Sequence, residues 1–249
     1  MNEPLIEGCV DSYVSAAAAV KAGADRLELC GQLIIGGVTP SPVLFRQVHR
    51  DFGVKINVLI RPRFGDFLYS EEELDQMCEE IKLFRDLGAN GAVVGVLTPD
   101  GRLDAERMAK LMACAGGMDV TLHRAFDMTA EPLAALEAAC SLGCRTILTS
   151  GQANSAESGR ELLKALRERA GGRLDIMAGA GVKSGNILAL HQFTGIRVFH
   201  TSGRRGTIPS GMTYRRESVS MGLPTLSEYE LWRTDEDEFG ACARIVHSL

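Results

Sequence analysis

Short apolar runs alternate with amphipathic segments along most of the chain. Each apolar run has the length and continuity of a strand that is buried on both faces. We predict eight such strands, at residues 5–9, 26–30, 55–61, 91–97, 119–124, 145–150, 174–179 and 196–202. The amphipathic segments predict helices at residues 11–22, 41–51, 70–87, 104–115, 131–142, 155–170, 184–194 and 235–247. The chain therefore reads as a repeated strand–helix unit.

Helix-capping signals support these boundaries. Ser70 is followed three residues later by Glu73, the pattern of a capping box, and Gly88 stands where that helix would end. Three predicted helices lead into the next strand through the same sequence of helix, glycine and strand, in "KAGADRLEL", "DLGANGAVV" and "SLGCRTILT". This recurrence indicates one structural unit used repeatedly.

Eight βα units in a chain of 249 residues predict a (β/α)8 TIM barrel. An open, doubly wound parallel sheet is the structural alternative, but the number and length of the strands favour the closed barrel. No linker divides the chain, so we predict one domain over residues 1–249. Residues 203–237 depart from the rhythm and are too long for a simple βα loop. We expect an extended arm there, serving as a lid, a packing arm or an oligomer contact.

Composition narrows the possible partners. The net charge is −5 and the pI is about 5.6, which argues against nucleic-acid binding, since that requires a cationic surface. No apolar run approaches the roughly 20 residues of a membrane-spanning helix, and the N-terminal "MNEPLIEGCV" lacks the features of a signal peptide. Seven scattered cysteines indicate reduced thiols rather than disulfides. We therefore expect a cytoplasmic protein with no membrane partner.

Polar residues collect at one end of the predicted strands. In a parallel barrel the functional groups come from the C-terminal ends of the strands and from the loops that follow them. Those positions hold ionisable, thiol and hydroxyl groups: Glu7, Cys9, Glu28, Cys30, Arg61, Arg63, His123, Arg124, Asp127, Thr149, Ser150, His200 and Ser202. The opposite ends carry ordinary turn residues. This asymmetry predicts a functional site at the C-terminal rim.

A Glu-x-Cys pattern occurs on both of the first two strands. Side chains alternate along a strand, so Glu7 shares a face with Cys9, and Glu28 shares a face with Cys30. If the two strands pair level with each other, the rim presents a carboxylate pair below a thiol pair. Two close thiolates suit Cu(I), whereas the ligand spacing typical of zinc sites is absent. The alternative is that both cysteines are small core residues.

Two further groups stand after the third and fifth strands. Arg61 and Arg63 flank a proline, and two guanidinium groups at a strand end suit a ligand carboxylate or phosphate. They are equally suited to pairing with acids of the rim. His123, Arg124 and Asp127 follow the fifth strand, where a histidine near an aspartate forms a possible acid–base pair. A structural histidine is the alternative.

Glycine-rich loops follow the last two strands. "MAGAGVKSGN" contains Gly179 and Gly181, and "HTSGRRG" contains Ser202 and Gly203. Glycines let backbone N–H groups approach an anion, and barrels often bind phosphate with these two loops. Ser150, after the sixth strand, is a further candidate for this site. The same glycines also suit tight corners, and no Walker, dinucleotide-binding or nucleophile-elbow motif occurs.

Seven motifs together carry a family resemblance. "IEGCV", "DRLELC", "GGVTPS", "IRPRFGDFLYS", "HRAFDM", "ILTSGQ" and "MAGAGV" occur in the order typical of the CutC family of copper homeostasis proteins. The similarity extends from about residue 5 to about residue 220 and includes "MTYR". It implies a cytosolic (β/α)8 barrel and a role in copper handling.

The resemblance also implies a pair of Cu(I) ligands. The family's proposed ligands correspond to Cys9 in "EGCV" and Cys30 in "LELC". The chain departs from a common pattern in having one thiol rather than two adjacent thiols after the first strand. It also has "HTSG" where many relatives have His-Ser-Ser. Neither departure removes a proposed ligand.

Three functions follow as hypotheses. The first is Cu(I) binding by Cys9 and Cys30 in copper homeostasis. The second is an enzyme acting on a small anionic or phosphorylated metabolite. In that hypothesis the anion is held by Arg61, Arg63, Arg124, Ser150, Gly179, Gly181, Ser202 and Gly203, and protons are moved by Glu7, Glu28, His123, Asp127 or His200. The third is an interaction scaffold that uses residues 203–237. The same segment predicts a homodimer or a higher homo-oligomer.

Overall fold

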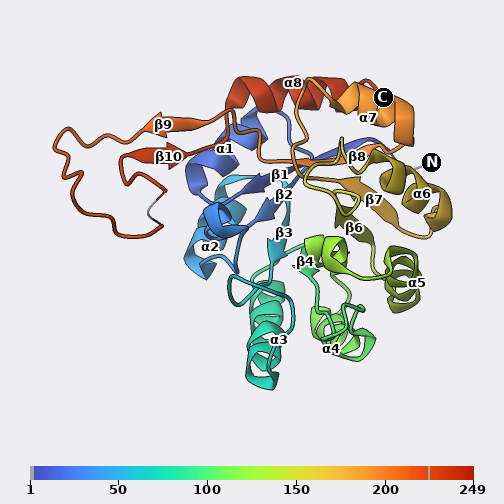
Figure 1. Cartoon of the computed structure of the whole chain (residues 1–249). Helices are drawn as coiled ribbons and strands as arrows, with labels where there is room; N and C mark the ends of the chain where they lie inside the picture. Colours follow the sequence, from blue (N-terminus) through green and yellow to red (C-terminus); the bar gives the residue numbers. More distant parts are fainter. Residues whose placement is uncertain (1–2, 224) are drawn as a thin grey trace.

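Eight parallel strands close into a barrel in the computed structural model, which describes residues 3–223 and 225–249 (Figure 1). Each strand pairs with the next, and β1 pairs with β8. The strands are β1 (Leu5–Val10), β2 (Arg26–Leu29), β3 (Lys55–Leu59), β4 (Gly91–Val94), β5 (Asp119–Leu122), β6 (Thr146–Thr149), β7 (Asp175–Ala178) and β8 (Val198–Thr201). The predicted (β/α)8 barrel is confirmed, and the open sheet is excluded.

The helices lie around the outside of the barrel (Figure 1). They are α1 (Tyr13–Lys21), α2 (Pro42–Asp51), α3 (Glu71–Asp86), α4 (Ala105–Ala115), α5 (Pro132–Leu142), α6 (Arg160–Ala170), α7 (Ile187–Thr194) and α8 (Glu236–His247). Two short 3-10 helices, η1 (Leu33–Ile35) and η2 (Arg124–Met128), were not predicted. Within the described residues, no helix is both long enough and apolar enough to span a bilayer.

Local sequence explains where these helices begin. The Ser70 side chain accepts the Glu73 N–H while the Glu73 side chain accepts the Ser70 N–H, so the predicted capping box at the start of α3 is confirmed. Helix α6 begins at Arg160 rather than at residue 155. The preceding residues form turns, in which Gly159 lies so close to the Ser150 carbonyl that a Cβ would be 2.0 Å from it. That close approach keeps the β6–α6 loop compact beside the barrel rim.

The outer face of the strands packs against the helices. Leu27 and Leu29 are fully buried on this face, as their alternation with Glu28 requires. Gly8 is needed opposite them, since a Cβ there would lie 3.1 Å from Leu27 and 3.2 Å from Ala19. The inner face of the barrel is thus left for polar side chains, among them Glu7, Cys9 and Glu28.

The segment between β8 and α8 extends away from the barrel (Figure 1). It contains a two-stranded antiparallel sheet of β9 (Thr207–Pro209) and β10 (Glu230–Trp232). Several of its large apolar side chains are exposed, including Met212, Tyr214 and Met221. This segment, residues 203–237, is called the arm below.

Candidate functional site

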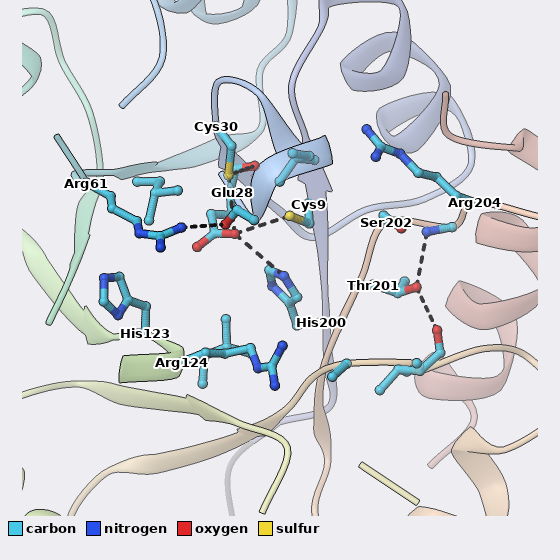
Figure 2. A pocket seen from close by; sticks show the side chains of 18 of the residues that line it. Cys9, Glu28, Cys30, Arg61, His123, Arg124, His200, Thr201, Ser202 and Arg204 are labelled. Carbon is cyan, nitrogen blue, oxygen red and sulfur yellow. Dashed lines mark hydrogen bonds and ion pairs between the residues drawn. The ribbon is translucent and has the colours of Figure 1, made fainter. Parts of the chain in front are cut away.

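A cavity of about 310 Å³ opens at the C-terminal ends of the barrel strands. Its walls come from β1 and β2 and from the loops after β2, β3, β5, β7 and β8. Figure 2 shows its polar side chains converging from these elements. They are Cys9, Glu28, Cys30, Arg61, His123, Arg124, Lys183, His200, Thr201, Ser202 and Arg204. The cavity therefore lies at the rim that the sequence predicts as functional.

A cluster of two thiols and one carboxylate forms the floor of the cavity. Glu28 Oε2 lies 3.3 Å from Cys9 Sγ and 3.5 Å from Cys30 Sγ. One ligand atom from each of the three residues lies within 4.8 Å of the others, and all three residues are buried. The thiols of the first two strands thus come together, as the Glu-x-Cys pattern predicts.

The register of the first two strands differs from the predicted one, in which a carboxylate pair lies below a thiol pair. Cys9 pairs with Glu28 and Glu7 pairs with Arg26 across the β1–β2 ladder. The two Glu-x-Cys segments are therefore offset by two residues, and the carboxylates do not form a level pair below the thiols. The strands of a closed barrel must tilt and shear, which sets this stagger. As a result Glu28 lies between the two sulfurs, and Glu7 lies one layer deeper.

Glu7 is held in a buried ionic network below the thiols. Its Oε2 accepts a hydrogen bond from Arg26 Nε at 2.5 Å, and its Oε1 lies 2.8 Å from His200 Nδ1. The other ring nitrogen of His200, Nε2, lies 3.5 Å from Glu28 Oε2. His200 therefore links the deep ion pair to the thiol cluster, as Figure 2 shows on the Glu28 side.

The network shifts the pKa values of its acidic groups and thiols. Burial raises the pKa of Glu7, but Arg26 and His200 outweigh it and lower that pKa to about 2. Hydrogen bonding from Cys30, together with the charge of His200, lowers the pKa of Cys9 well below its usual value. Burial raises the pKa of both Glu28 and Cys30. The environment thus favours loss of the Cys9 thiol proton and disfavours loss of the Cys30 thiol proton.

Arg61 and His123 form the opposite wall. The Arg61 guanidinium donates to the carbonyls of Gly37 at 3.0 Å and Gly65 at 2.7 Å, and it lies over the Phe67 ring. His123 contacts the same ring, and its Nδ1 accepts the Ala125 N–H at 3.1 Å. Burial and the charge of Arg61 lower the pKa of His123 to about 3. The imidazole is therefore neutral, with its proton on Nε2.

Several predicted residues lie outside the cavity. Arg63 forms ion pairs with Glu73 and Asp66 on the outer side of the loop, so it is not an anion ligand of this cavity. Asp127 does not pair with His123. Its carboxylate instead accepts hydrogen bonds from Arg124 and from the Ser150 N–H and hydroxyl, which orders the start of the β6–α6 loop.

The two glycine loops contribute to the rim in different ways. Gly181, Ser202 and Gly203 line the cavity, as predicted, whereas Gly179 packs against Leu148 behind it. Ala180 adopts a left-handed conformation with φ of 69°, which few residues with a Cβ adopt. This turn brings the backbone of the β7–α7 loop to the cavity wall.

The sequence analysis missed several residues of the site. Arg26 begins β2 and resembles a solvent-facing strand end, but its side chain reaches inward to Glu7. Lys183 and Arg204 line the cavity, and Arg204 pairs with Asp11 at 2.8 Å. Gly95 leaves room for His123, because a Cβ there would lie 2.6 Å from the ring. A glycine directly after β4 is the signal that identifies this last contact.

Comparison with known proteins identifies the family. The model of the CutC family matches residues 4–205. The CutC family protein of Chromobacterium violaceum is 45% identical over 239 residues, covering 96% of each chain. The chain belongs to the CutC family. The human relative, a copper homeostasis protein cutC homolog, is 45% identical over 235 residues, covering 94% of this chain and 86% of the relative.

Solved structures agree with this membership. The crystal structure of the CutC protein from Streptococcus agalactiae superposes with a TM-score of 0.77 at 31% identity. It covers 80% of this chain and 98% of the other. A deoxyribose-phosphate aldolase fold from Coccidioides immitis, at 14% identity and a TM-score of 0.58, shares the barrel alone. The match to the CutC family model ends at residue 205, before β9, so that model covers the barrel strands and only the first three residues of the arm.

Proposed function

We propose that the protein binds Cu(I) through Cys9 and Cys30 and takes part in copper homeostasis. The observation that carries the proposal is the grouping of two buried sulfurs and one carboxylate within 4.8 Å. Cu(I) prefers sulfur and tolerates few ligands, so two thiols suffice for it. Zn²⁺ commonly takes four protein ligands at a structural site, more than the three of this cluster. Several relatives carry the CutC name, and the human one is called a copper homeostasis protein.

The surroundings of the two thiols favour a soft cation. Metal binding requires both thiols to lose their protons, and the lowered pKa of Cys9 favours the first of these losses while the raised pKa of Cys30 opposes the second. Glu28 Oε2 is within reach as a third donor. Cys9 is 8% exposed and Cys30 is fully buried, which limits the access of water to bound Cu(I). The nearby Arg26 and His200 offset the negative charge that two thiolates bring.

Replacing both cysteines tests this proposal. A Cys9→Ser/Cys30→Ser variant is expected to bind Cu(I) at least a hundredfold more weakly, because serine hydroxyls are poor ligands for a soft metal. Competition with a colorimetric Cu(I) chelator under anaerobic conditions measures the affinity.

A second double variant provides a matched control. Cys78 on α3 and Cys114 on α4 also lie next to each other. Burial and a hydrogen bond with the Cys114 thiol raise the pKa of Cys78 to about 11. A Cys78→Ser/Cys114→Ser variant therefore removes the same number of neighbouring thiols outside the cavity. It is expected to keep the affinity of the wild type. An unchanged affinity in the Cys9/Cys30 variant, or an equal loss in the control, contradicts the proposal.

An enzyme is a second candidate, favoured by the His200 environment. His200 contacts Glu7 through Nδ1 and faces Glu28 through Nε2, and Cys9 completes the group. An imidazole that a carboxylate orients beside a thiol and a carboxyl is able to move a proton within a cavity. Glu28, His123 and His200 line the cavity, whereas Glu7 orients His200 from below and Asp127 lies outside. The cysteine variants do not separate copper handling from catalysis, but the anion experiment in the next subsection bears on the enzyme candidate.

The cysteines support a reducing compartment. All seven carry free thiols, distributed over the barrel and its helices. Two of them, Cys9 and Cys30, lie in one buried cluster with Glu28, and free thiols are typical of reducing compartments. We therefore propose a cytoplasmic location, where both thiols stay reduced and available to Cu(I).

The arm supports a homo-oligomer. Met221 is 82% exposed and Tyr214 is 65% exposed, and apolar side chains are seldom left in such a group without a partner surface. Light scattering at micromolar concentration is expected to give a dimer or larger. Met221→Asp is expected to shift the mass toward the monomer, whereas Met128→Asp, at a position on η2 that is 67% exposed, is not. A wild-type monomer contradicts the proposal.

A further inference from the structure

Unpartnered hydrogen-bond donors are concentrated in the cavity. Among the described residues, five buried side-chain nitrogen or oxygen atoms lack a hydrogen-bond partner, and three of them belong to residues that line this cavity. The three are Arg61 Nε, His123 Nε2 and Arg204 Nε. Buried polar groups are nearly always paired in folded proteins. A concentration of unpaired donors around one hollow indicates a ligand that accepts hydrogen bonds.

Arg61 adds a requirement for negative charge. It is 7% exposed, and its hydrogen bonds go to backbone carbonyls of Gly37 and Gly65, with a longer one of 3.4 Å to Gly36. No carboxylate pairs with it in the described part of the chain. A buried cation without a counter-charge is costly, and water satisfies its hydrogen bonds but not its charge. An anion satisfies both.

His123 is suited to the same anion. Its Nδ1 is occupied by the Ala125 N–H, so Nε2 carries the proton and donates. Arg61 and His123 both lie against the Phe67 ring, so the two donors are neighbours. Figure 2 shows them together on one side of the cavity, with Glu28 and His200 between them and Arg204. A guanidinium and a neutral N–H donor side by side form a binding pair for one oxyanion group.

The charge of the remaining cavity wall points the same way. Arg124 and Arg204 have carboxylate partners in Asp127 and Asp11. The exposed Lys183 ammonium has no ion pair among the described residues, so two cations that line the cavity, Arg61 and Lys183, lack an ion-pair partner. A copper cation gains nothing from these two groups. They therefore indicate a second ligand, distinct from the metal.

We propose that the cavity binds a small organic oxyanion, with its carboxylate or phosphate group held by the side chains of Arg61 and His123. The volume of about 310 Å³ is at the small end for ligand pockets, which limits the ligand to a small metabolite. The site includes Arg61 and His123 but excludes Arg63, whose guanidinium is engaged by Glu73. This inference does not depend on copper binding, and it supplies the class of ligand for the enzyme candidate.

Titration with two simple anions tests the inference. Inorganic phosphate and malonate are titrated separately into the full-length protein at constant ionic strength, by calorimetry and by NMR of the arginine Nε–H groups. Saturable binding of at least one anion is expected, together with a shift of the Arg61 Nε–H signal. The anion that saturates the protein at the lower concentration shows whether the cavity prefers a phosphate or a carboxylate group.

Two variants test the binding residues, and two others serve as controls. Arg61→Gln is expected to lower the affinity for the anion at least tenfold. His123→Asn is expected to lower it several-fold, since asparagine keeps the Ala125 hydrogen bond but loses the Nε2 donor. Arg63→Gln, on the same loop, is expected to bind as the wild type does. The Cys9→Ser/Cys30→Ser variant is expected to keep anion binding, so failure of the copper proposal leaves this result intact.

Four outcomes overturn the inference. They are the absence of saturation by both anions at tens of millimolar, unchanged affinity in both Arg61→Gln and His123→Asn, an equal loss in Arg63→Gln, and an Arg61 Nε–H signal that does not move. If Arg61→Gln fails to fold because the 36–37 and 65 carbonyls lose their donor, His123→Asn and the wild-type NMR signal decide the question.

Discussion

A Glu7→Ala variant is expected to lose about 3–5 kcal/mol of unfolding free energy, the usual effect of removing one partner of a buried ion pair. Glu7 is 1% exposed and Arg26 is 9% exposed, and their side chains meet at 2.5 Å. Without Glu7, the Arg26 guanidinium keeps only the more distant attraction of Asp119 and Asp175. Chemical denaturation at neutral pH measures the loss.

Two comparisons identify the cause of this loss. A Glu7→Leu/Arg26→Met variant removes both charges and is expected to recover a large part of the stability, since no buried charge is left alone. Glu137→Ala removes a carboxylate that also bonds two arginines, Arg169 and Arg173, but on the surface. It is expected to have little effect, because solvent screens exposed pairs. If Glu7→Ala is no more harmful than Glu137→Ala, the network is not a stabilising element.

The barrel was predictable because its signal is distributed over the whole chain. Each of the eight strands is largely buried and reads as an apolar run, and several of the helices begin at a capping side chain, such as Ser12 at α1 and Ser70 at α3. The strand ends were less predictable. Arg61 and His123 were expected within strands, but β3 ends at Leu59 and β5 ends at Leu122. Apolar residues such as Ile60 continue the pattern past the last residue of the strand.

The uncertainty of the strand ends also explains why Arg63 was placed in the site. Residues two apart share a face only in a strand, and the chain after Leu59 is not one. Arg61 therefore turns into the cavity while Arg63 turns out to Glu73. The stagger that places Cys9 beside Glu28 depends on barrel shear, which arises only when all eight strands close. Local sequence patterns contain the residues of the site but not this register.

The cavity combines two kinds of binding group that a single ligand does not need. Its floor offers sulfur and a carboxyl group from β1 and β2, and its Arg61 wall offers unpaired N–H donors from the loops after β3 and β5. The first set suits a soft cation and the second suits an oxyanion. The proposed binding of Cu(I) and the proposed binding of an anion are thus expected to be separable by mutation, although both proposals place the ligand within one hollow.

The second large effect is a dependence of stability on pH that comes from His123. Its pKa is about 3 in the folded protein, because of burial and of the Arg61 charge, against 6.5 for a free histidine. Between these values the unfolded chain takes up a proton that the folded chain does not, so stability falls as pH falls. The loss is about 1.4 kcal/mol for each pH unit below 6.5, or about 2 kcal/mol at pH 5.

A His123→Asn variant isolates this contribution. Asparagine does not titrate, and its side-chain oxygen is able to accept the Ala125 N–H in place of Nδ1. The variant is expected to be less stable than the wild type at pH 7, because part of the ring volume next to Gly95 and Phe67 is lost. The difference in unfolding free energy between the wild type and the variant is expected to shrink by about 2 kcal/mol between pH 7 and pH 5, since only the wild type loses stability through His123 as the pH falls. Urea denaturation at both pH values measures it, and a difference that stays constant means that His123 is protonated in the fold as readily as in the unfolded chain.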